Sequence, residues 1–379
     1  MYIKLPSVLA EGAKETLLMQ IYHLSRDVNS VNLENEGIRI ELDTEVDGFK
    51  TSVDKLIDKT ARSFRKVSVD IEMEHFVEPS FTENPMESLL ESKQALEIVP
   101  GVYGFQGDLL KVINRIDQML LLGALELGAV EQSYSTLLPI KSMIANSYLS
   151  SFPHHAFLVS LFHQDFDGLS LASKIRGLEE LRSESLENSE LMLSPTVCHH
   201  CFEALKKSRL SDGPLIITSV GKCHRFEGGG VRDLSRMHVF TMREIVLYGD
   251  PIWLEDQLRK IKEIYCSMFR RWGLSFSVKT ATDPFFPVSN ESKRAFQSLR
   301  KLKQEIAVRL PFSGDDIACI SLNNHMKTLV DIYDIQSGDV ELESGCVGFG
   351  YERLAFALFA QFGMDTIKWP ETVRTELRL

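Results

Sequence analysis

Residues 215–273 carry the pattern that most constrains the fold: strand segments on either side of a glycine-rich loop, followed by a long helix. The segment LIITSVGKCHRFE at 215–227 is interpreted as two strands that meet at Gly221. After three consecutive glycines, MHVFTMREIVLYG at 237–249 is interpreted as another strand. Strands joined by short turns pair in antiparallel fashion, so this stretch predicts an antiparallel sheet.

The helix that follows these strands has clear ends. Asp250 can cap its free amides, Pro251 suits its first position and Gly273 is placed to end it. Strands with helices laid on the sheet predict the α+β class. We also expect helices at 53–64, 108–128 and 351–363, strands at 37–43, 274–280 and 345–350, and a solvated helix or loop at 177–190.

The chain is long enough, at 379 residues, for two or three domains. Three prolines, Pro79, Pro85 and Pro100, lie with several acidic residues within 76–101, and prolines at that density break regular elements. We therefore expect a small N-terminal α/β region at 1–97 that ends in a proline-rich acidic linker. Its role cannot be assigned from composition. A larger α+β domain is expected at 98–379.

Charge and hydropathy exclude several classes of function. The net charge of −11 disfavours binding of nucleic acid or anionic membrane, so an anionic partner needs a local basic patch. The first residues lack the apolar core of a secretory signal, and the apolar stretch at 119–130 carries Glu126 and is too short to span a bilayer. Six cysteines spread through such a long chain do not form a disulfide framework. A cytoplasmic protein with reduced thiols and no membrane contact is expected.

Several residues could carry chemistry because of the faces they share. Arg225 and Glu227 point to the same side of a strand, and the glycines that follow let a loop approach a ligand closely. Phe240 and Glu244 also share a face, where an unpaired charge is costly. Arg353 falls in the first turn of a helix entered through glycines, a natural seat for phosphate. Taken singly, an Arg–Glu pair is usually a surface ion pair and a phenylalanine is usually core.

The run Cys198-His199-His200-Cys201 offers four metal ligands in succession. A structural zinc site normally draws its ligands from two separated clusters, and the sequence has no second CxxC or HxxxH. A redox CxxC pair is a further possibility, although a thioredoxin-like context is missing. Both interpretations are weak on the sequence alone.

The order of these segments resembles the catalytic domain of class II aminoacyl-tRNA synthetases. CHRFE at 223–227 is similar to the second signature motif and GFGYERLAFAL at 348–358 to the third, while ANSYLSSFPHH at 145–155 occupies the place of the first. Within the class the chain resembles the seryl type, and more closely the amino acid:[carrier protein] ligases, which are truncated seryl-type relatives. The closer resemblance spans about 100–379 and rests on SYLSSFPHH, SPTVC, HRFEGG with FTMREIV, TDPFF, ACISLNNH, GCVGFGYERLAFALF and WPETVR.

The resemblance implies a zinc ion held by Cys198, Glu244 and Cys346. Three protein ligands leave one coordination position open, as a substrate-binding zinc requires, and that position would take the neutral α-amino group of a small amino acid. His199, His200 and Cys201 would then be bystanders or outer partners of the site.

The resemblance also implies an ATP site with Mg²⁺ bound to the phosphates. Arg225 would hold the α-phosphate, Glu227 would contact the adenine amino group or the motif loop, and Phe240 would stack on adenine. Arg353 would lie over the adenine and hold the γ-phosphate end. Arg232 and Arg236 would contact pyrophosphate. Ser321 and Asn323 would line the amino-acid pocket or contact metal-bound ATP. Asp316 is considered as a magnesium ligand.

The implied reaction is activation of a small amino acid, glycine or alanine, as its adenylate and transfer to the phosphopantetheine thiol of a carrier protein. The alternative is a seryl-type enzyme that charges tRNA, and residues 1–97 argue against it because they lack heptads and carry several acids. A second alternative is an inactive paralogue that acts as a regulatory or scaffold subunit. The class implies a homodimer. Candidate docking residues for an acidic carrier are the basic segment 292–303 and Arg270 with Arg271.

Overall fold

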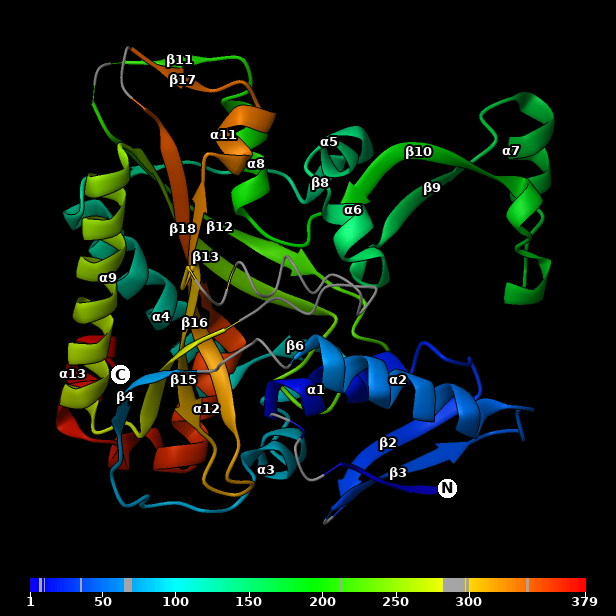
Figure 1. The fold of residues 1–379 in the computed structure, drawn as a ribbon, viewed down its shortest axis with the longest axis horizontal. Helices are drawn as coiled ribbons and strands as arrows, with labels where there is room; N and C mark the ends of the chain where they lie inside the picture. The colour runs from blue at the N-terminus through cyan, green and yellow to red at the C-terminus, as the bar shows by residue number, and fades with distance from the viewer. Residues whose placement is uncertain are drawn as a thin grey trace.

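The body of the molecule is an eight-stranded sheet in the order β4-β14-β15-β16-β18-β13-β12-β7 (Figure 1). A computed structural model describes residues 1–379 apart from 7, 8, 10, 35, 65–69, 212, 282–296, 298–299 and 339–340. All neighbours in this sheet pair antiparallel except β7, which runs parallel to β12. The strands are β4 (Ile71–His75), β7 (Val130–Glu131), β12 (Leu215–His224), β13 (Val239–Gly249), β14 (Phe276–Thr280), β15 (Lys303–Arg309), β16 (Asp316–Met326) and β18 (Glu343–Gly350).

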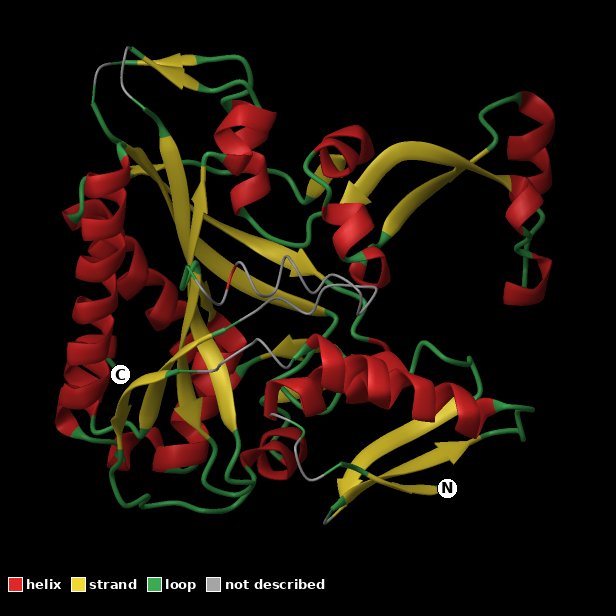
Figure 2. Cartoon of the chain, in the orientation of Figure 1, coloured by secondary structure: helices red, strands yellow, loops and turns green. Residues whose placement is uncertain are grey.

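Helices cover both faces of this sheet because its central strands are apolar on both sides. Along β13, Ile245 and Leu247 join the main core, whereas Val246 and Tyr248 join a smaller core on the opposite face. The main core is completed by α3 (Pro85–Glu91), α4 (Gly107–Glu126), α9 (Pro251–Trp272), α12 (Tyr351–Phe362) and α13 (Glu371–Leu377). The smaller core is completed by α8 (Cys198–Ala204) and α11 (Thr328–Ile332). The expected α+β class is confirmed (Figure 2).

The helix α9 ends where the sequence predicts. The carboxylate of Asp250 accepts hydrogen bonds from the amides of Ile252 and Trp253, both at 3.0 Å. Pro251 occupies the first helical position, and Gly273 takes the left-handed conformation with φ of 73°. Gly221 does not separate two strands, however. It pairs with Met242 within an unbroken register, so 215–224 is one strand.

The N-terminal residues form a compact unit of their own. Its sheet has the order β1-β3-β2 and is covered by two helices whose apolar faces pack on it. The unit ends earlier than the sequence suggested: β4 pairs with β14 of the large sheet, and Met86 and Leu89 of α3 enter the main core. Residues 71–97 therefore pack with the larger domain. The elements are β1 (Tyr2–Lys4), α1 (Glu11–Ile21), β2 (Val28–Glu34), β3 (Gly37–Leu42) and α2 (Phe49–Ser63).

A three-stranded arm, in the order β8-β10-β9, projects from the body on the same side as the N-terminal unit (Figure 1). The segment 177–190, expected as a solvated helix or loop, instead leads through 3₁₀ turns into strand β10. The arm is built from β8 (Leu137–Pro139), β9 (Leu158–Phe162), α7 (Phe166–Ala172) and β10 (Leu186–Leu193). Smaller elements are β5 (Ala95–Val99), β6 (Val102–Phe105), α5 (Ile140–Ala145), α6 (Tyr148–Ser151), β11 (Arg209–Leu210) and β17 (Gln336–Ser337). Within the described ranges, no helix is long and apolar enough to cross a bilayer.

Candidate active site

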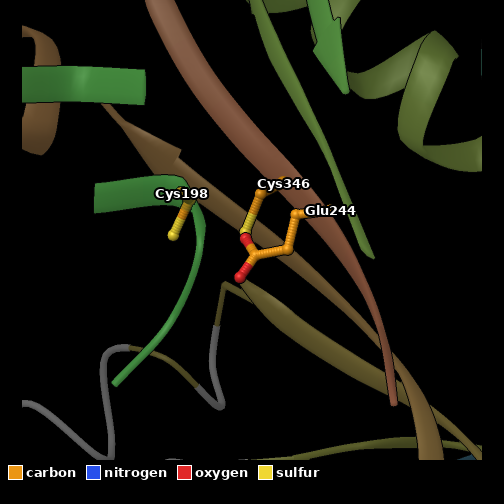
Figure 3. A group of neighbouring side chains, drawn as sticks. All are labelled: Cys198, Glu244 and Cys346. Carbon is orange, nitrogen blue, oxygen red and sulfur yellow. The ribbon is translucent and has the colours of Figure 1, made fainter. Parts of the chain in front are cut away.

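Three side chains that could hold a metal ion meet beneath α8. One ligand atom from each of Cys198, Glu244 and Cys346 lies within 4.8 Å of the others, and all three residues are buried. They come from the first turn of α8, from β13 and from β18, and they point toward one another (Figure 3). The structure thus brings together the three residues that the resemblance implied as metal ligands.

The sheet register explains how two of these ligands come together. Glu244 lies opposite Gly348 and Val246 lies opposite Cys346, so Glu244 and Cys346 are diagonal neighbours on one face. A side chain at position 348 would be obstructed, because an added Cβ would lie 2.5 Å from Cε of Met242 and 3.7 Å from Cγ of Glu244. Gly348 therefore leaves room for the glutamate to lie across the neighbouring strand.

The chemistry of the cluster fits a thiophilic divalent cation. Glu244 is 2% exposed, and one carboxylate oxygen accepts a hydrogen bond from the amide of Val197 at 2.9 Å. Its other oxygen, Oε2, is buried with no hydrogen-bond partner among the described residues. An orphaned carboxylate oxygen beside two thiols is costly unless a cation satisfies it. Two thiolates and one carboxylate leave a tetrahedral zinc ion with one open position.

The acid–base properties of the metal-free cluster support the same interpretation. Burial raises the pKa of Glu244, although the thiol of Cys198 and the amide of Val197 act in the opposite direction. Hydrogen bonding to Cys198, together with burial, raises the pKa of Cys346 well above its usual value. Without a cation these groups resist ionisation, and a bound divalent cation reverses that preference.

The sequence did not single out three residues that line this cluster. Nε2 of His325 lies 3.5 Å from Sγ of Cys346, and Oγ1 of Thr196 lies 3.0 Å from Sγ of Cys198. Ser219 lies directly opposite Glu244 on β12, and its buried hydroxyl has no hydrogen-bond partner in the described part of the chain. Beyond the cluster, Nδ2 of Asn146 donates a hydrogen bond to the hydroxyl of Tyr333 at 3.1 Å and lies 3.3 Å from Nδ1 of His199. Ser219 and His325 lie on strands of the large sheet and Thr196 precedes α8, so the fold brings them to the cluster and their spacing in the sequence does not reveal it.

The other members of the 198–201 run are held by different partners. Nδ1 of His199 lies 3.3 Å from Nδ2 of Asn146, and the ring of His200 stacks on Tyr134 with centroids 5.5 Å apart. Burial raises the pKa of Cys201 well above the usual value of a thiol. Within the described residues, none of the three joins the metal-ligand cluster. His199, His200 and Cys201 are therefore interpreted as bystanders or outer partners of the metal-ligand cluster.

Replacing Cys201 with alanine is expected to leave the metal in place. The thiol is fully buried, so the free energy of unfolding should fall by about 1 kcal/mol. Mass spectrometry of metal content after gel filtration checks that the metal is retained, and chemical denaturation measures the change in the free energy of unfolding. Loss of the metal from this variant would restore the four-residue knuckle as the ligand set.

A second group of predicted residues lies along the same sheet face. The guanidinium of Arg225 lies 5.2 Å from the ring centroid of Phe240, a cation–π distance. Nε of Arg225 also donates a hydrogen bond to the carbonyl of Pro195 at 3.0 Å. Glu227 makes a long ion pair of 3.9 Å with Arg236. These four side chains, predicted separately from three stretches, therefore converge.

Arg353 completes this positively charged end of the site. Its Nε donates to the carbonyl of Ser235 at 2.7 Å and its Nη1 to the carbonyl of Ala318 at 3.1 Å. Burial lowers the pKa of Arg353, and the nearby charges of Arg236 and Arg225 lower it further. The positive charges of Arg225 and Arg236 near Arg353 form a site suited to a polyanion.

The remaining predicted residues vary in their proximity to this site. Nδ2 of Asn323 lies 3.1 Å from Oγ of Ser321 and 3.7 Å from Sγ of Cys346, so both residues border the metal-ligand cluster. The exposed Arg232 forms a long ion pair of 3.9 Å with Asp315. Asp316, considered for magnesium, makes an ion pair of 2.7 Å with Arg309.

The candidate docking residues gain little support. Arg271 makes an ion pair of 3.1 Å with Glu376, and Arg270 contacts the sulfur of Met73. Most of the segment 292–303, including 292–296, lies outside the described residues, as does TDPFF at 282–286.

Comparisons with known proteins agree with this geometry. The family model of the class II tRNA synthetase core domain (G, H, P, S and T) matches residues 181–362. The amino acid–[acyl-carrier-protein] ligase 1 of Bradyrhizobium diazoefficiens is 29% identical over 74% of this chain and 85% of its own length. A type-2 serine–tRNA ligase of Methanococcus maripaludis (strain S2 / LL) is 23% identical over 92% of this chain and 69% of its own.

Among solved structures, the SerRS of M. kandleri, determined in complex with tRNASec of A. aeolicus, has a similar fold. It superposes with a TM-score of 0.72 at 20% identity, over 92% of this chain and 73% of that one. The large antiparallel sheet, its flanking helices and the neighbouring arginines thus occur in a chain whose residues 181–362 match the model of the class II tRNA synthetase core domain. The protein therefore has the class II synthetase catalytic fold and is similar in sequence to the amino acid–[acyl-carrier-protein] ligases.

Proposed function

We propose that this protein is an ATP-dependent ligase that activates glycine or alanine and transfers it to the phosphopantetheine thiol of a carrier protein. The observation that carries the proposal is the position of the metal-ligand cluster relative to the arginines. Glu244 and Phe240 lie on one face of β13, opposite Ser219 and Cys223 of β12, and Arg225 follows β12 directly. An amino acid held by its amine at one end of this face can present its carboxylate toward the arginines at the other.

Cys198, Glu244 and Cys346 would hold zinc, and when bound the ion supplies a Lewis-acidic position for the neutral α-amino group of the substrate. Because three positions of a tetrahedral ion would be taken by the protein, the one remaining position would fix the orientation of the substrate. Any α-amino acid can bind through its amine, so selection by size must come from neighbouring side chains. Ser321 and Asn323, which border Cys346, are the residues we assign to that pocket.

Activation requires positioning and charge compensation, and it requires no protein nucleophile. A substrate carboxylate oxygen attacks the α-phosphorus of ATP, the bond to the bridging oxygen breaks, and pyrophosphate leaves with that electron pair. Arg225 would hold the α-phosphate while Phe240 stacks on the adenine and Glu227 contacts its amino group. Arg353 would hold the γ-phosphate end, with Arg236 and the more distant Arg232 beside the pyrophosphate. Mg²⁺ enters with ATP and neutralises phosphate oxygens.

In the transfer step the thiol sulfur of the carrier attacks the activated carbonyl carbon. A thioester forms, the bond to the phosphate oxygen breaks, and AMP leaves, while the thiol proton passes to a phosphate oxygen of AMP. Similarity to two amino acid–[acyl-carrier-protein] ligases, at 29% and 28% identity, supports a thiol acceptor. We also propose that the protein forms a homodimer, as its resemblance to class II synthetases implies.

A tRNA acceptor is the second candidate, and one observation favours it. The match to a type-2 serine–tRNA ligase extends over 92% of this chain, whereas the match to the carrier-protein ligases covers 74%. The additional similarity includes part of the N-terminal unit. A catalytically inactive scaffold is disfavoured, because Arg225, Arg353 and the three metal-type ligands are all present.

The two acceptors can be separated in one experiment. Purified protein, ATP and Mg²⁺ are mixed with glycine, alanine or serine, and each mixture receives either a phosphopantetheinylated carrier protein or total tRNA from the same source. Intact mass reports the carrier and acid-precipitable label reports the tRNA. We expect glycine or alanine on the carrier and no label on tRNA. Charging of tRNA without loading of the carrier would contradict the proposed acceptor.

A further inference from the structure

The N-terminal unit contacts the larger domain at the glycine loop that follows Glu227. Gly228–Gly230 form a 3₁₀ turn directly after Glu227, and the amide of Gly230 donates a hydrogen bond to the carbonyl of Glu227 at 3.0 Å. The ring of Tyr22, just past the end of α1, lies directly against Gly229. A Cβ added at position 229 would overlap the tyrosine ring. The two domains therefore make contact at position 229, where any side chain larger than that of glycine would collide with the ring of Tyr22.

Tyr22 is held in this position from its own side. Its hydroxyl accepts a hydrogen bond from the amide of Val31 at 3.0 Å, and its ring packs on the core of the N-terminal unit. The ring is thus fixed at both ends and cannot swing aside as a free surface side chain can. It forms a rigid support beneath the glycine turn.

A second contact beside Tyr22 reaches the other flank of the same turn. The ring of His23 meets the ring of His154 edge to face, with centroids 5.3 Å apart. The next residue, His155, accepts a hydrogen bond through its carbonyl from the amide of Phe226 at 3.1 Å. Tyr22 therefore contacts the turn directly, and His23 contacts the residue before His155, whose carbonyl holds Phe226.

The shape of the turn determines where two nucleotide-binding candidates lie. Gly228 adopts φ of +55°, so the backbone reverses immediately after Glu227. A Cβ at Gly230 would lie 3.3 Å from Nη1 of Arg236, which itself pairs with Glu227. A shift of this turn would move Glu227 and Arg236 together.

We propose that the N-terminal unit, through Tyr22, holds the glycine turn at 228–230 and thereby positions Glu227 and Arg236 for ATP. Tyr22 is a positioning residue in this account, because it acts on the nucleotide through the turn. The inference rests on the proposed function for its effect on ATP, while the contact itself stands on the geometry. It gives the N-terminal unit a role in adenylate formation in addition to any contact with the acceptor.

The test compares Tyr22→Ala, Gly229→Ala and the double variant in amino-acid-dependent exchange of pyrophosphate with ATP. Each single variant should raise KM for ATP about tenfold with little change in kcat, because ATP loses a pre-shaped turn. Gly229 has no positive φ, so alanine there strains only the contact with Tyr22. The double variant should be no worse than Tyr22→Ala alone. Tyr22→Phe keeps the ring and should restore most of the affinity.

Two further measurements separate this inference from the proposed function. Tyr2→Ala, at an exposed tyrosine of the same unit, is the matched control and should leave KM for ATP unchanged. Amide hydrogen exchange of the full chain should show faster exchange at 226–230 in Tyr22→Ala, whether or not the protein is active. Wild-type protection of the turn in Tyr22→Ala, or effects of the two single variants that multiply in the double variant, would overturn the inference. If the wild-type protein shows no exchange of pyrophosphate with ATP, the proposed function is contradicted, while the contact between Tyr22 and the glycine turn is still tested by amide hydrogen exchange.

Discussion

Cys346→Ala should bind no metal, and its rate of amino-acid activation should fall by about a hundredfold or more. This loss is larger than the one that usually follows when a hydrogen-bond partner of a metal ligand is removed. Cys346 is one of the three proposed metal ligands and is 5% exposed, so its loss removes one of the two thiols of the buried cluster. With two ligands left, the site no longer meets the coordination that zinc requires. The measurements are metal content per chain by mass spectrometry and exchange of pyrophosphate with ATP.

Cys266→Ala is the matched control for this prediction. Cys266 is also a buried cysteine, at 1% exposure, but it lies on α9 within the main core. The control should keep its metal and its activity. Equal loss of metal in both variants would indicate general damage to the fold, and full retention of metal by Cys346→Ala would rule out the three-ligand site.

The second large effect is expected for Arg353→Ala, which should lower adenylate formation by about two to three orders of magnitude while the metal stays bound. The side chain is held by the carbonyls of Ser235 and Ala318, and it lies near Arg225 and Arg236. Removing it takes away a fixed positive charge where the phosphates of ATP are proposed to lie. Adenylate formation in a single turnover and metal content are measured on the same sample.

Arg259→Ala serves as the matched control for Arg353. Arg259 is an exposed arginine of α9 that pairs with Glu263 and Asp256 on its own helix, so its loss should leave adenylate formation unchanged. A normal rate of adenylate formation in Arg353→Ala would contradict the assignment of the third signature motif.

The elements with strong local signals were predicted well from the sequence. Helix α9 has a capping aspartate, a proline and a terminal glycine, and all three have the expected roles. Gly221 was misinterpreted because a glycine can either interrupt a strand or lie within a continuous one. The pairing of Gly221 with Met242 shows that the strand is continuous. Likewise, the prolines at 76–101 indicated a linker, whereas β4 and α3 pack with the large sheet.

The candidate site could be predicted only through resemblance to a family. Cys198, Glu244 and Cys346 are far apart in the sequence, and no spacing rule joins them. The registers of β13 with β18 and of β16 with β18 bring Glu244, Cys346 and Asn323 together, and α8 packs Cys198 against them. The support that Tyr22 gives to the glycine turn had no sequence signal, because it depends on how two domains pack.

The most direct test of the central claim is exchange of pyrophosphate with ATP by the zinc-loaded wild-type protein, with glycine, alanine and serine in parallel. The account predicts exchange with glycine or alanine that is lost on treatment with a chelator and restored by zinc. Absence of exchange with every one of these amino acids, in protein shown to carry one zinc per chain, would contradict it.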